Sequence, residues 1–301
     1  MRGTRVVSRA AAWRSLLYVP GSSDKMLAKS RSVRADMLVY DLEDSVARHR
    51  KQAARSMVAE ALSSAPPGGP TLGVRINAPS SEPDLARADV DAVLRSERVE
   101  SLVLPKVESA RDLALVASAA SPSVPLSLVL SVESASSLLR MPTILEHASL
   151  GPHVRVAALL FASEDYCAAT GVQRTRDLRS LLYPRAQMAT IAKAYGLQAI
   201  DMVCIEYKDD AYLREECRDG ASLGFDGKQA IHPAQLDAIH AAYSPSKEDV
   251  DMARAVLDAY RQGAREGRGA VGLAHHGKEI MIDAPMLLQA QRTLERAGIT
   301  P

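Results

Sequence analysis

The feature of this sequence that most limits its possible folds is a series of eight short aliphatic runs. They occupy residues 16–19, 37–40, 72–76, 102–104, 126–132, 156–161, 199–203 and, more weakly, 223–225. Most are apolar throughout rather than alternating, which is typical of parallel strands covered on both faces. The segments between them show helical spacing of apolar residues, as at 47–62, 83–98 and 178–195. The pattern predicts a strand followed by a helix, repeated eight times.

The spacing of these runs favours one closed barrel. The residues that follow successive runs lie about 30 residues apart, close to the roughly 31-residue unit of a (β/α)8 barrel. An α/β fold of the TIM-barrel type therefore accounts for residues 14–243. A doubly wound nucleotide-binding fold is the weaker alternative, because neither G-x-G-x-x-G after the first strand nor G-x-x-x-x-G-K-[ST] occurs.

A C-terminal helical and lid extension, residues 244–301, follows the predicted barrel. We expect a long amphipathic helix at 247–262, a mobile glycine-rich loop at 263–277 and a last helix that ends near Ala297. The extension is too short to own a core, so it is predicted to pack on the barrel as a lid or an exchange arm.

The N-terminal residues 1–13 form a basic tail. The stretch before Asp24 carries Arg2, Arg5, Arg9 and Arg14 and no acid. This bias fits the remnant of a mitochondrial transit peptide, and a disordered tail is the alternative. The predicted location is mitochondrial, with the cytoplasm as the other possibility.

Composition narrows the classes of partner. Lys and Arg number 37 against 36 Asp and Glu, so the chain lacks the basic excess that nucleic-acid binders use, and no nucleic acid is expected. No apolar run approaches the roughly 18 residues needed to cross a bilayer, so no membrane is expected either. The three cysteines include no C-x-x-C pair, which favours a reducing compartment over a disulfide framework or a zinc cluster.

Charged residues close several of the predicted strands. Arg75, Glu133 and Asp165 stand at strand ends, and the two acids are one strand-helix unit apart. Catalytic groups of such barrels sit at this end of the strands. Two carboxylates on neighbouring strands predict a Mg²⁺ site, because Mg²⁺ prefers oxygen ligands and keeps part of its water shell. The alternative is a pair of solvated loop acids, or salt bridges to Arg75 and Lys106.

Two further groups are candidates near the second and fourth strands. Asp41 and Glu43 are predicted catalytic groups, and the alternative is that this acid cluster caps the next helix through Asp44 or Ser45. Lys106 could form a Schiff base with a keto acid, although pairing with Glu108 or Glu133 is the more natural expectation.

Seven motifs in order resemble one enzyme family. They are LYVPG at 17–21, YDLEDSV at 40–46, VRIN at 74–77, LPKVE at 104–108, FASED at 161–165, GFDGKQAIHP at 224–233 and MIDAP at 281–285. Together they are similar to the HpcH/HpaI aldolase and citrate lyase β-subunit family, most of all to its stand-alone citrate lyase β-like branch. The similarity runs from about residue 14 to 297. Ala162 departs from the usual glycine of its motif, and its extra methyl group is expected to narrow the pocket.

The resemblance implies a lyase that uses Mg²⁺ as its cofactor, with Mn²⁺ as the alternative metal. Its substrate is a 3-hydroxyacyl-CoA of the citramalyl type, cleaved to acetyl-CoA and pyruvate. Carried over by motif, Glu133 and Asp165 are the metal ligands, and Arg75 and Glu133 contact the substrate. Asp283 is the acid/base, on an arm that reaches a neighbouring subunit of a trimer.

Outside these motifs, Lys25 and Lys29 are candidates for contacts with the CoA phosphates. Three alternatives share the same residues. They are malyl-CoA cleavage, a synthase-like condensation that yields malate or citramalate, and a citrate lyase β subunit that depends on an acyl-carrier partner.

Overall fold

The computed structural model describes residues 13–120, 125–266, 271–275 and 278–300. The chain divides into two compact units, Met1–Ile239 and His240–Pro301. Among the described residues, no helix combines the length and the apolar character that a membrane span requires.

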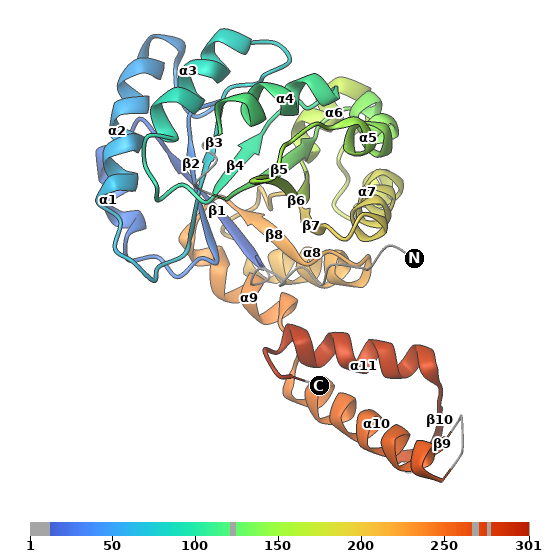
Figure 1. The fold of residues 1–301 in the computed structure, drawn as a ribbon. Coiled ribbons are helices and arrows are strands. Elements are labelled where there is room, and N and C mark those ends of the chain that lie inside the picture. Colours follow the sequence, from blue (N-terminus) through green and yellow to red (C-terminus); the bar gives the residue numbers. More distant parts are fainter. Residues whose placement is uncertain (1–12, 121–124, 267–270, 276–277, 301) are drawn as a thin grey trace. The chain divides into compact units, whose positions relative to one another are not determined.

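The first unit is a closed barrel of eight parallel strands (Figure 1). The strands are β1 (Ser15–Pro20), β2 (Met37–Asp41), β3 (Thr71–Arg75), β4 (Ser101–Leu104), β5 (Leu126–Val132), β6 (Val154–Phe161), β7 (Gln198–Asp201) and β8 (Gly227–Ala230). Neighbours in sequence are neighbours in the sheet, and β8 pairs with β1 to close it, with Leu16 opposite Gln229. The predicted (β/α)8 fold is therefore confirmed.

The helices of this unit surround the strands in Figure 1. They are α1 (Asp24–Ser30), α2 (Lys51–Ser63), α3 (Pro83–Val93), α4 (Ala110–Ala119), α5 (Ala135–His147), α6 (Ser163–Thr170), α7 (Leu182–Ala194) and α8 (Asp210–Ser222), and α9 (Leu236–Tyr243) follows β8. The predicted helix at 83–98 is five residues shorter in the structure, since α3 ends at Val93.

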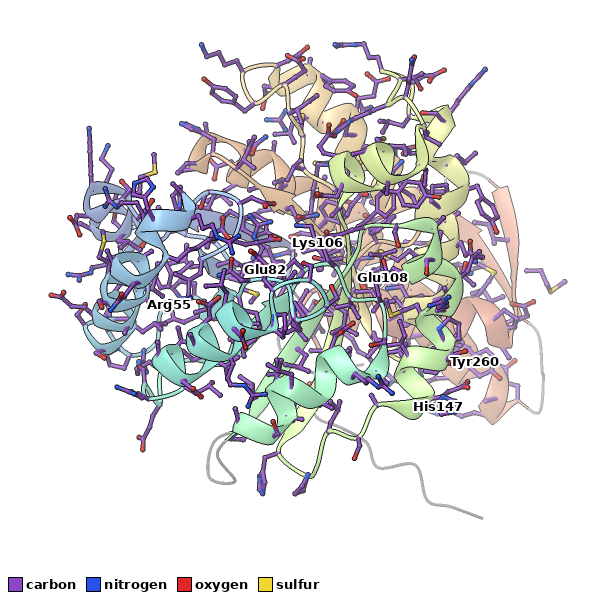
Figure 2. All side chains as sticks on the ribbon, turned by 90° about the horizontal axis from the view of Figure 1, so that it is seen from above. Arg55, Glu82, Lys106, Glu108, His147 and Tyr260 are labelled. Carbon is purple, nitrogen blue, oxygen red and sulfur yellow. The ribbon has the colours of Figure 1, made fainter. Side chains whose placement is uncertain are left out.

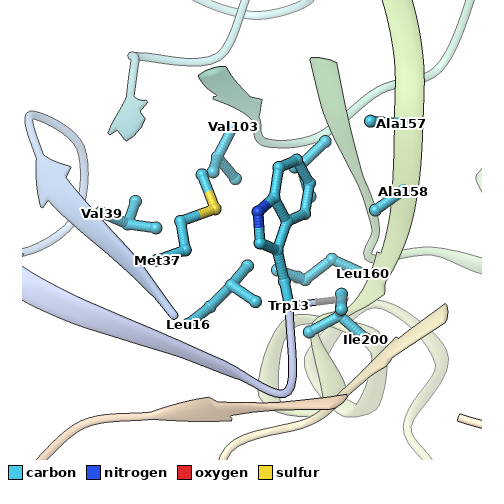
Figure 3. Close-up of a cluster of buried hydrophobic side chains, with 10 residues drawn as sticks. Trp13, Leu16, Met37, Val39, Val103, Ala157, Ala158, Leu160 and Ile200 are labelled. Atoms are coloured by element: carbon cyan, nitrogen blue, oxygen red, sulfur yellow. The ribbon is translucent and has the colours of Figure 1, made fainter. Parts of the chain in front are cut away.

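A cluster of apolar side chains fills the barrel around Trp13 (Figure 3). Leu16, Met37, Val103 and Ile200 belong to this cluster and come from four different strands. Trp13 is 4% exposed, and its indole N–H donates to Thr71 Oγ1 at 3.2 Å. The residue that the sequence analysis counted as the last of the basic tail is thus part of the barrel core.

Arg14 also belongs to the barrel. Its guanidinium donates to both carboxylate oxygens of Asp36, at 2.8 Å each. Counting Arg14 with the basic leader residues was therefore wrong, because its charge has a partner within the fold. Residues 1–12 lie outside the described residues.

The eighth strand was predicted in the wrong place. Residues 223–225 follow the end of α8, where Gly224 has φ +93° and the chain turns. The strand is Gly227–Ala230, whose four residues are all buried although two of them are polar. A search for aliphatic runs misses such a strand. Gly227 is required there, because a Cβ would overlap the carbonyl oxygen of Trp13, just before the adjoining strand β1.

Buried ion pairs replace apolar packing behind β7 and β8. Lys228 Nζ lies 3.1 Å from Glu216 Oε2, and both side chains are inaccessible to solvent. Arg185 donates to Asp201 at 2.7 Å and to Asp219 at 2.5 Å. Burial opposes ionisation of Asp201, but Lys228 and Arg185 outweigh it and hold the pKa of Asp201 below its usual value. These charges are stable inside the protein because each has an opposite charge beside it.

The second unit pairs two helices through a short hairpin. It consists of α10 (Lys247–Arg265), β9 (Val271–His275), β10 (Lys278–Ile282) and α11 (Ala284–Arg296). Val256, Leu257, Ile282 and Leu294 are buried in a small core of this unit, so the expectation that the extension is too short to have its own core was wrong. The prediction of a mobile loop over 263–277 was wrong for 271–275, because these residues pair antiparallel with β10. Residues 267–270 and 276–277 lie outside the described part.

We expect Arg185→Ala to lower the free energy of unfolding by about 3–5 kcal/mol, because it leaves the buried Asp201 carboxylate short of a partner. Chemical denaturation measures this change. Arg214→Ala is the matched control, since Arg214 pairs with Asp210 at the surface and such pairs contribute about 0–1 kcal/mol. Equal losses in the two variants would contradict a structural role for the buried pair.

Candidate active site

A cavity of about 420 Å³ opens at the carboxyl ends of the barrel strands. Its lining residues come from the ends of β1, β2, β3 and β6 to β8 and from the loops after them. They are Tyr18, Pro20, Asp41, Asp44, Ser45, Arg75, Ala162, Ser163, Glu164, Asp165, Val203, Gln229 and Ile231. Of the predicted site residues, Asp41, Arg75 and Asp165 are therefore brought together in one pocket.

Arg75 is held in a fixed orientation at the end of β3. Its Nε and Nη2 each donate to a different oxygen of Asp41, both at 2.7 Å. Nη1 lies 3.1 Å from Glu43 Oε2, and the guanidinium carbon stands 4.9 Å from the centre of the Tyr18 ring. A guanidinium has more N–H groups than these two acids use, so Arg75 can still donate into the cavity.

Asp41 works as a support for this arginine. Burial opposes its ionisation, but the hydrogen bonds and charge of Arg75 hold the pKa of Asp41 below its usual value. Its carboxylate also accepts from the backbone N–H of Glu43 at 2.9 Å and of Ser45 at 3.1 Å. Because its oxygens are engaged in this way, the geometry favours a positioning role over the catalytic role predicted for Asp41.

The expectation that Asp44 or Ser45 caps the next helix was wrong. Helix α2 begins at Lys51, and the side chain of its N-cap residue, Arg50, makes no capping hydrogen bond. The ammonium of Lys51 instead donates to the carbonyl oxygens of Leu42 and Glu43, at 2.8 and 2.7 Å. Lys51, in the first turn of α2, thus holds the loop after β2 in place through two of its backbone carbonyl groups.

Lys106, in the loop after β4 (Figure 2), pairs with Glu43. Its Nζ donates to Glu43 Oε1 at 2.5 Å, rather than to Glu108 or Glu133 as expected from the sequence. Burial lowers the pKa of Lys106, but the hydrogen bond and the charge of Glu43 have the larger effect and raise this pKa to about 12. Burial raises the pKa of Glu43 above its usual value, although Arg75 and Lys106 oppose this. Glu43 is therefore shared between two cations.

Glu133 is a buried carboxylate whose charge is poorly compensated. It is 6% exposed, and among the described residues its Oε2 has no hydrogen-bond partner. Burial, and then the nearby charges of Asp165 and Glu43, raise its pKa to about 7. A cation between Glu133 and Asp165 would relieve this repulsion, and two carboxylates supplemented by water and substrate oxygens suit Mg²⁺. The described residues hold no cluster of three or more acidic, histidine or cysteine ligands.

The remaining predicted site residues are not among those that line the cavity. Lys25 and Lys29 lie exposed on α1, immediately after the first strand. Asp283 belongs to the second unit, where its carboxylate accepts from the backbone N–H of Met286 at 3.1 Å and caps α11. The expected N-cap role of Asp283, with Pro285 in the first turn, is confirmed.

The sequence analysis missed two residues of the site. Tyr18 faces the Arg75 guanidinium, and Gln229 donates from the pocket wall to the carbonyl oxygens of Phe161 and Asp201. Both lie inside motifs that had been recognised, LYVPG and GFDGKQAIHP. Tyr18 lies within β1 and Gln229 within β8. Only the alternation of side chains along each strand could have indicated that these two side chains point towards the site.

The sequence and the architecture match a known family. A model of the HpcH/HpaI aldolase/citrate lyase family matches residues 14–233. The chain belongs to this family. Among curated members, the chain is 37% identical to human mitochondrial citramalyl-CoA lyase, over 94% of this chain and 85% of that protein. It is 32% identical to a (3S)-malyl-CoA thioesterase of Cereibacter sphaeroides, over 96% of each.

A solved structure of the family carries the same fold. The CitE protein of Mycobacterium tuberculosis, in complex with magnesium, acetoacetate and coenzyme A, superposes with a TM-score of 0.73. It is 31% identical, and the alignment covers 96% of this chain and 99% of that one. A family member with this fold thus binds magnesium and coenzyme A.

We expect Mg²⁺ to bind about tenfold more weakly at pH 6 than at pH 8, because below its pKa of about 7 Glu133 carries a proton that competes with the metal. Isothermal titration calorimetry at the two values of pH measures this difference. Glu133→Gln should abolish both the binding and its pH dependence, whereas Glu60→Gln on the exposed face of α2 is the control. An affinity that is equal at both values of pH would contradict the assignment.

Proposed function

We propose that this protein is a Mg²⁺-dependent carbon–carbon lyase that cleaves a 3-hydroxyacyl-CoA of the citramalyl type to acetyl-CoA and pyruvate. The observation that carries the proposal is the buried Glu133 carboxylate, with its unpartnered Oε2 and Asp165 nearby, close to a pocket that presents Arg75. The similarity to human citramalyl-CoA lyase supports the choice of acyl group.

Glu133 and Asp165 would hold the metal, and Mn²⁺ is expected to substitute for Mg²⁺. When bound, the cation supplies Lewis-acid stabilisation of negative charge that develops on substrate oxygens. The carboxylates fit this role because their own charges need a partner in the buried site.

Arg75 would bind the carboxylate or carbonyl oxygens of the substrate. Cleavage of the carbon–carbon bond beside a thioester leaves an enolate, whose oxygen charge a fixed guanidinium stabilises. Asp41 and Glu43 hold the guanidinium in place, so little reorganisation is needed during the reaction. This preorganisation is the contribution of the two acids to catalysis.

Asp283 would act as the acid that protonates the enolate carbon, and as the base in the reverse direction. The proton of the substrate's 3-hydroxyl group would pass to water as that carbon becomes the ketone of pyruvate, so the overall reaction neither gains nor loses a proton. Its backbone position is set by the start of α11, where it is the N-cap residue. We propose that the second unit brings this residue to a site in a homotrimer, on the barrel of a neighbouring subunit. Lys25 and Lys29 on α1 would contact the phosphates of coenzyme A.

An imine mechanism through Lys106 has less support. A lysine that attacks a keto acid must be uncharged, and such lysines have a lowered pKa. The Glu43 carboxylate instead raises the pKa of Lys106 to about 12, against the effect of burial. The ammonium thus stays protonated near neutral pH.

We propose a mitochondrial location. The citramalyl-CoA lyases of human, rat and mouse that resemble this chain are mitochondrial proteins. The arginines at positions 2, 5 and 9, in a stretch without acids, are consistent with an import signal.

A panel of acyl-CoAs should distinguish the proposed function from its neighbours. Citramalyl-CoA should yield pyruvate at the highest kcat/KM, and EDTA should abolish turnover while borohydride with pyruvate leaves it intact. Glyoxylate from malyl-CoA as the preferred product would favour the malyl-CoA alternative, and release of free CoA would favour the thioesterase activity of the Cereibacter relative. Activity of the purified chain on free CoA thioesters excludes dependence on an acyl-carrier partner.

Asp283→Asn should lower kcat by about 10²-fold or more, the usual contribution of a general acid or base. Asparagine is as good an N-cap as aspartate, so α11 and the fold should be preserved. Magnesium affinity is expected to stay unchanged, which calorimetry checks. Asp258→Asn, at an exposed position of α10, is the control, and wild-type turnover in Asp283→Asn would exclude the acid/base role.

A further inference from the structure

Gln229 is a buried side chain whose amide group has a fixed orientation. It stands in β8, is 4% exposed, and is one of the residues that line the cavity. Its Nε2 donates to the carbonyl oxygen of Phe161 at 2.9 Å and to that of Asp201 at 3.0 Å. Both partners are backbone carbonyl groups, so the reverse orientation of the amide would set oxygen against oxygen. The two hydrogen bonds therefore fix which half of the amide is the nitrogen.

The other half of this amide is unused. A glutamine amide has two N–H donors and one carbonyl oxygen that accepts. Both donors of Gln229 are bonded to the last residues of β6 and β7. Within the described part of the chain, no residue donates to its Oε1. Because Gln229 lines the cavity, its Oε1 is a hydrogen-bond acceptor that is left for a ligand.

A second buried glutamine, six residues further along the chain, shows the contrast. Gln235 is 1% exposed, and its Nε2 donates to the carbonyl oxygen of Cys204 at 3.0 Å. Its Oε1 accepts from the backbone N–H groups of Ile231 at 2.9 Å and His232 at 3.2 Å. Gln235 is not among the residues that line the cavity. Contacts within the protein thus account for both halves of the Gln235 amide, but for only the nitrogen of Gln229.

Other acceptors of the cavity differ from Gln229 in charge or in bonding. Asp41 accepts from Arg75 with both carboxylate oxygens, and Glu164 accepts from Arg174 at 2.7 Å. The serine hydroxyl groups in the lining can donate as well as accept. Gln229 is different because it offers a neutral oxygen that can only accept.

The surroundings of this oxygen are partly apolar. Three apolar residues that line the cavity lie within two residues of Gln229 or of the carbonyl groups that it binds. They are Ala162, Val203 and Ile231. An acceptor in apolar surroundings forms a stronger hydrogen bond than one in water, and it costs more when it is left unpaired. The site therefore favours a ligand that brings a donor over one of the same shape that lacks it.

We infer that Gln229 Oε1 accepts a hydrogen bond from the 3-hydroxyl group of the substrate, and that Gln229 thereby selects hydroxylated acyl groups. The inference rests on the proposed function, since that function makes the ligand a 3-hydroxyacyl-CoA. The carboxylate and the thioester carbonyl of a citramalyl group only accept hydrogen bonds, so the 3-hydroxyl is its one donor. An amide oxygen does not take up a proton near neutral pH. The contact therefore orients the hydroxyl group without acting as a base.

Two matched ligands test the inference on the wild-type protein. Citramalyl-CoA and its 3-deoxy analogue differ only in the hydroxyl group, and calorimetry in the presence of EDTA measures the binding of both without turnover. EDTA also removes any metal-bound water that could donate to Oε1. We expect citramalyl-CoA to bind about tenfold more tightly or better. Equal affinities would overturn the inference and leave the proposed function standing. Failure of both ligands to bind would overturn the proposed substrate, and the inference with it.

Variants test whether the preference comes from Gln229. Gln229→Met removes the amide from a side chain of similar length and should bind the two ligands equally. Gln229→Lys removes the acceptor but keeps a donor for the two carbonyl groups, which covers the case in which Gln229→Met fails to fold. Its charge acts on both ligands alike, so the ratio of affinities should again fall to about one.

Gln235→Met is the matched control, because it removes a buried amide that does not line the cavity. It should keep the wild-type ratio of affinities for the two ligands. A ratio that stays at the wild-type value in the folded Gln229 variants would overturn the inference, as would a ratio that Gln235→Met lowers as much as they do.

Discussion

Charge buried at the end of a barrel must be compensated, and this constraint organises the whole of the first unit. Taking an ion out of water costs several kcal/mol unless an opposite charge or hydrogen bonds replace the solvent. Arg75 forms an ion pair with Asp41, Lys106 with Glu43, and Arg185 with Asp201. Glu133 departs from the rule, since its Oε2 has no partner among the described residues. The incomplete compensation is what makes this position suitable for a cation.

The compensated charges fall into two groups with different roles. Behind β7 and β8, Lys228, Glu216 and Asp201 are closed to solvent, so they contribute to stability and to the shape of the wall. Around β2, β3 and β4, the ion pairs reach the cavity or its rim, and they orient groups that remain able to donate or accept. The same interaction therefore supports the fold on one side of the barrel and prepares the site on the other.

Loops after separate strands act together because they are bonded to one another. The loop after β4 carries Lys106, whose backbone and side chain contact the loops after β3 and β2, and Glu108, whose carboxylate accepts from Ser134 after β5. Such cross-links reduce the freedom of loops that would otherwise move independently. A site built on them keeps its geometry before substrate arrives, which lowers the reorganisation needed in the transition state.

The sequence by itself determined the barrel, because seven aliphatic runs at regular spacing can be buried together only as parallel strands covered by helices. It also predicted a site from Arg75, Glu133 and Asp165, since charged residues at the ends of such strands converge on one face, and the structure places Arg75 and Asp165 in one cavity. It could not locate β8, whose buried residues include Lys228 and Gln229. A hydropathy pattern counts these side chains as exposed, because it does not show that an ion pair or hydrogen bonds allow them to be buried. The partners of Asp41, Glu43 and Lys106, and the left-handed backbone of Lys106, were decided by the tertiary structure alone. The physical reason is that these contacts join loops more than 25 residues apart in sequence, where only closure of the barrel brings the charges within reach of one another.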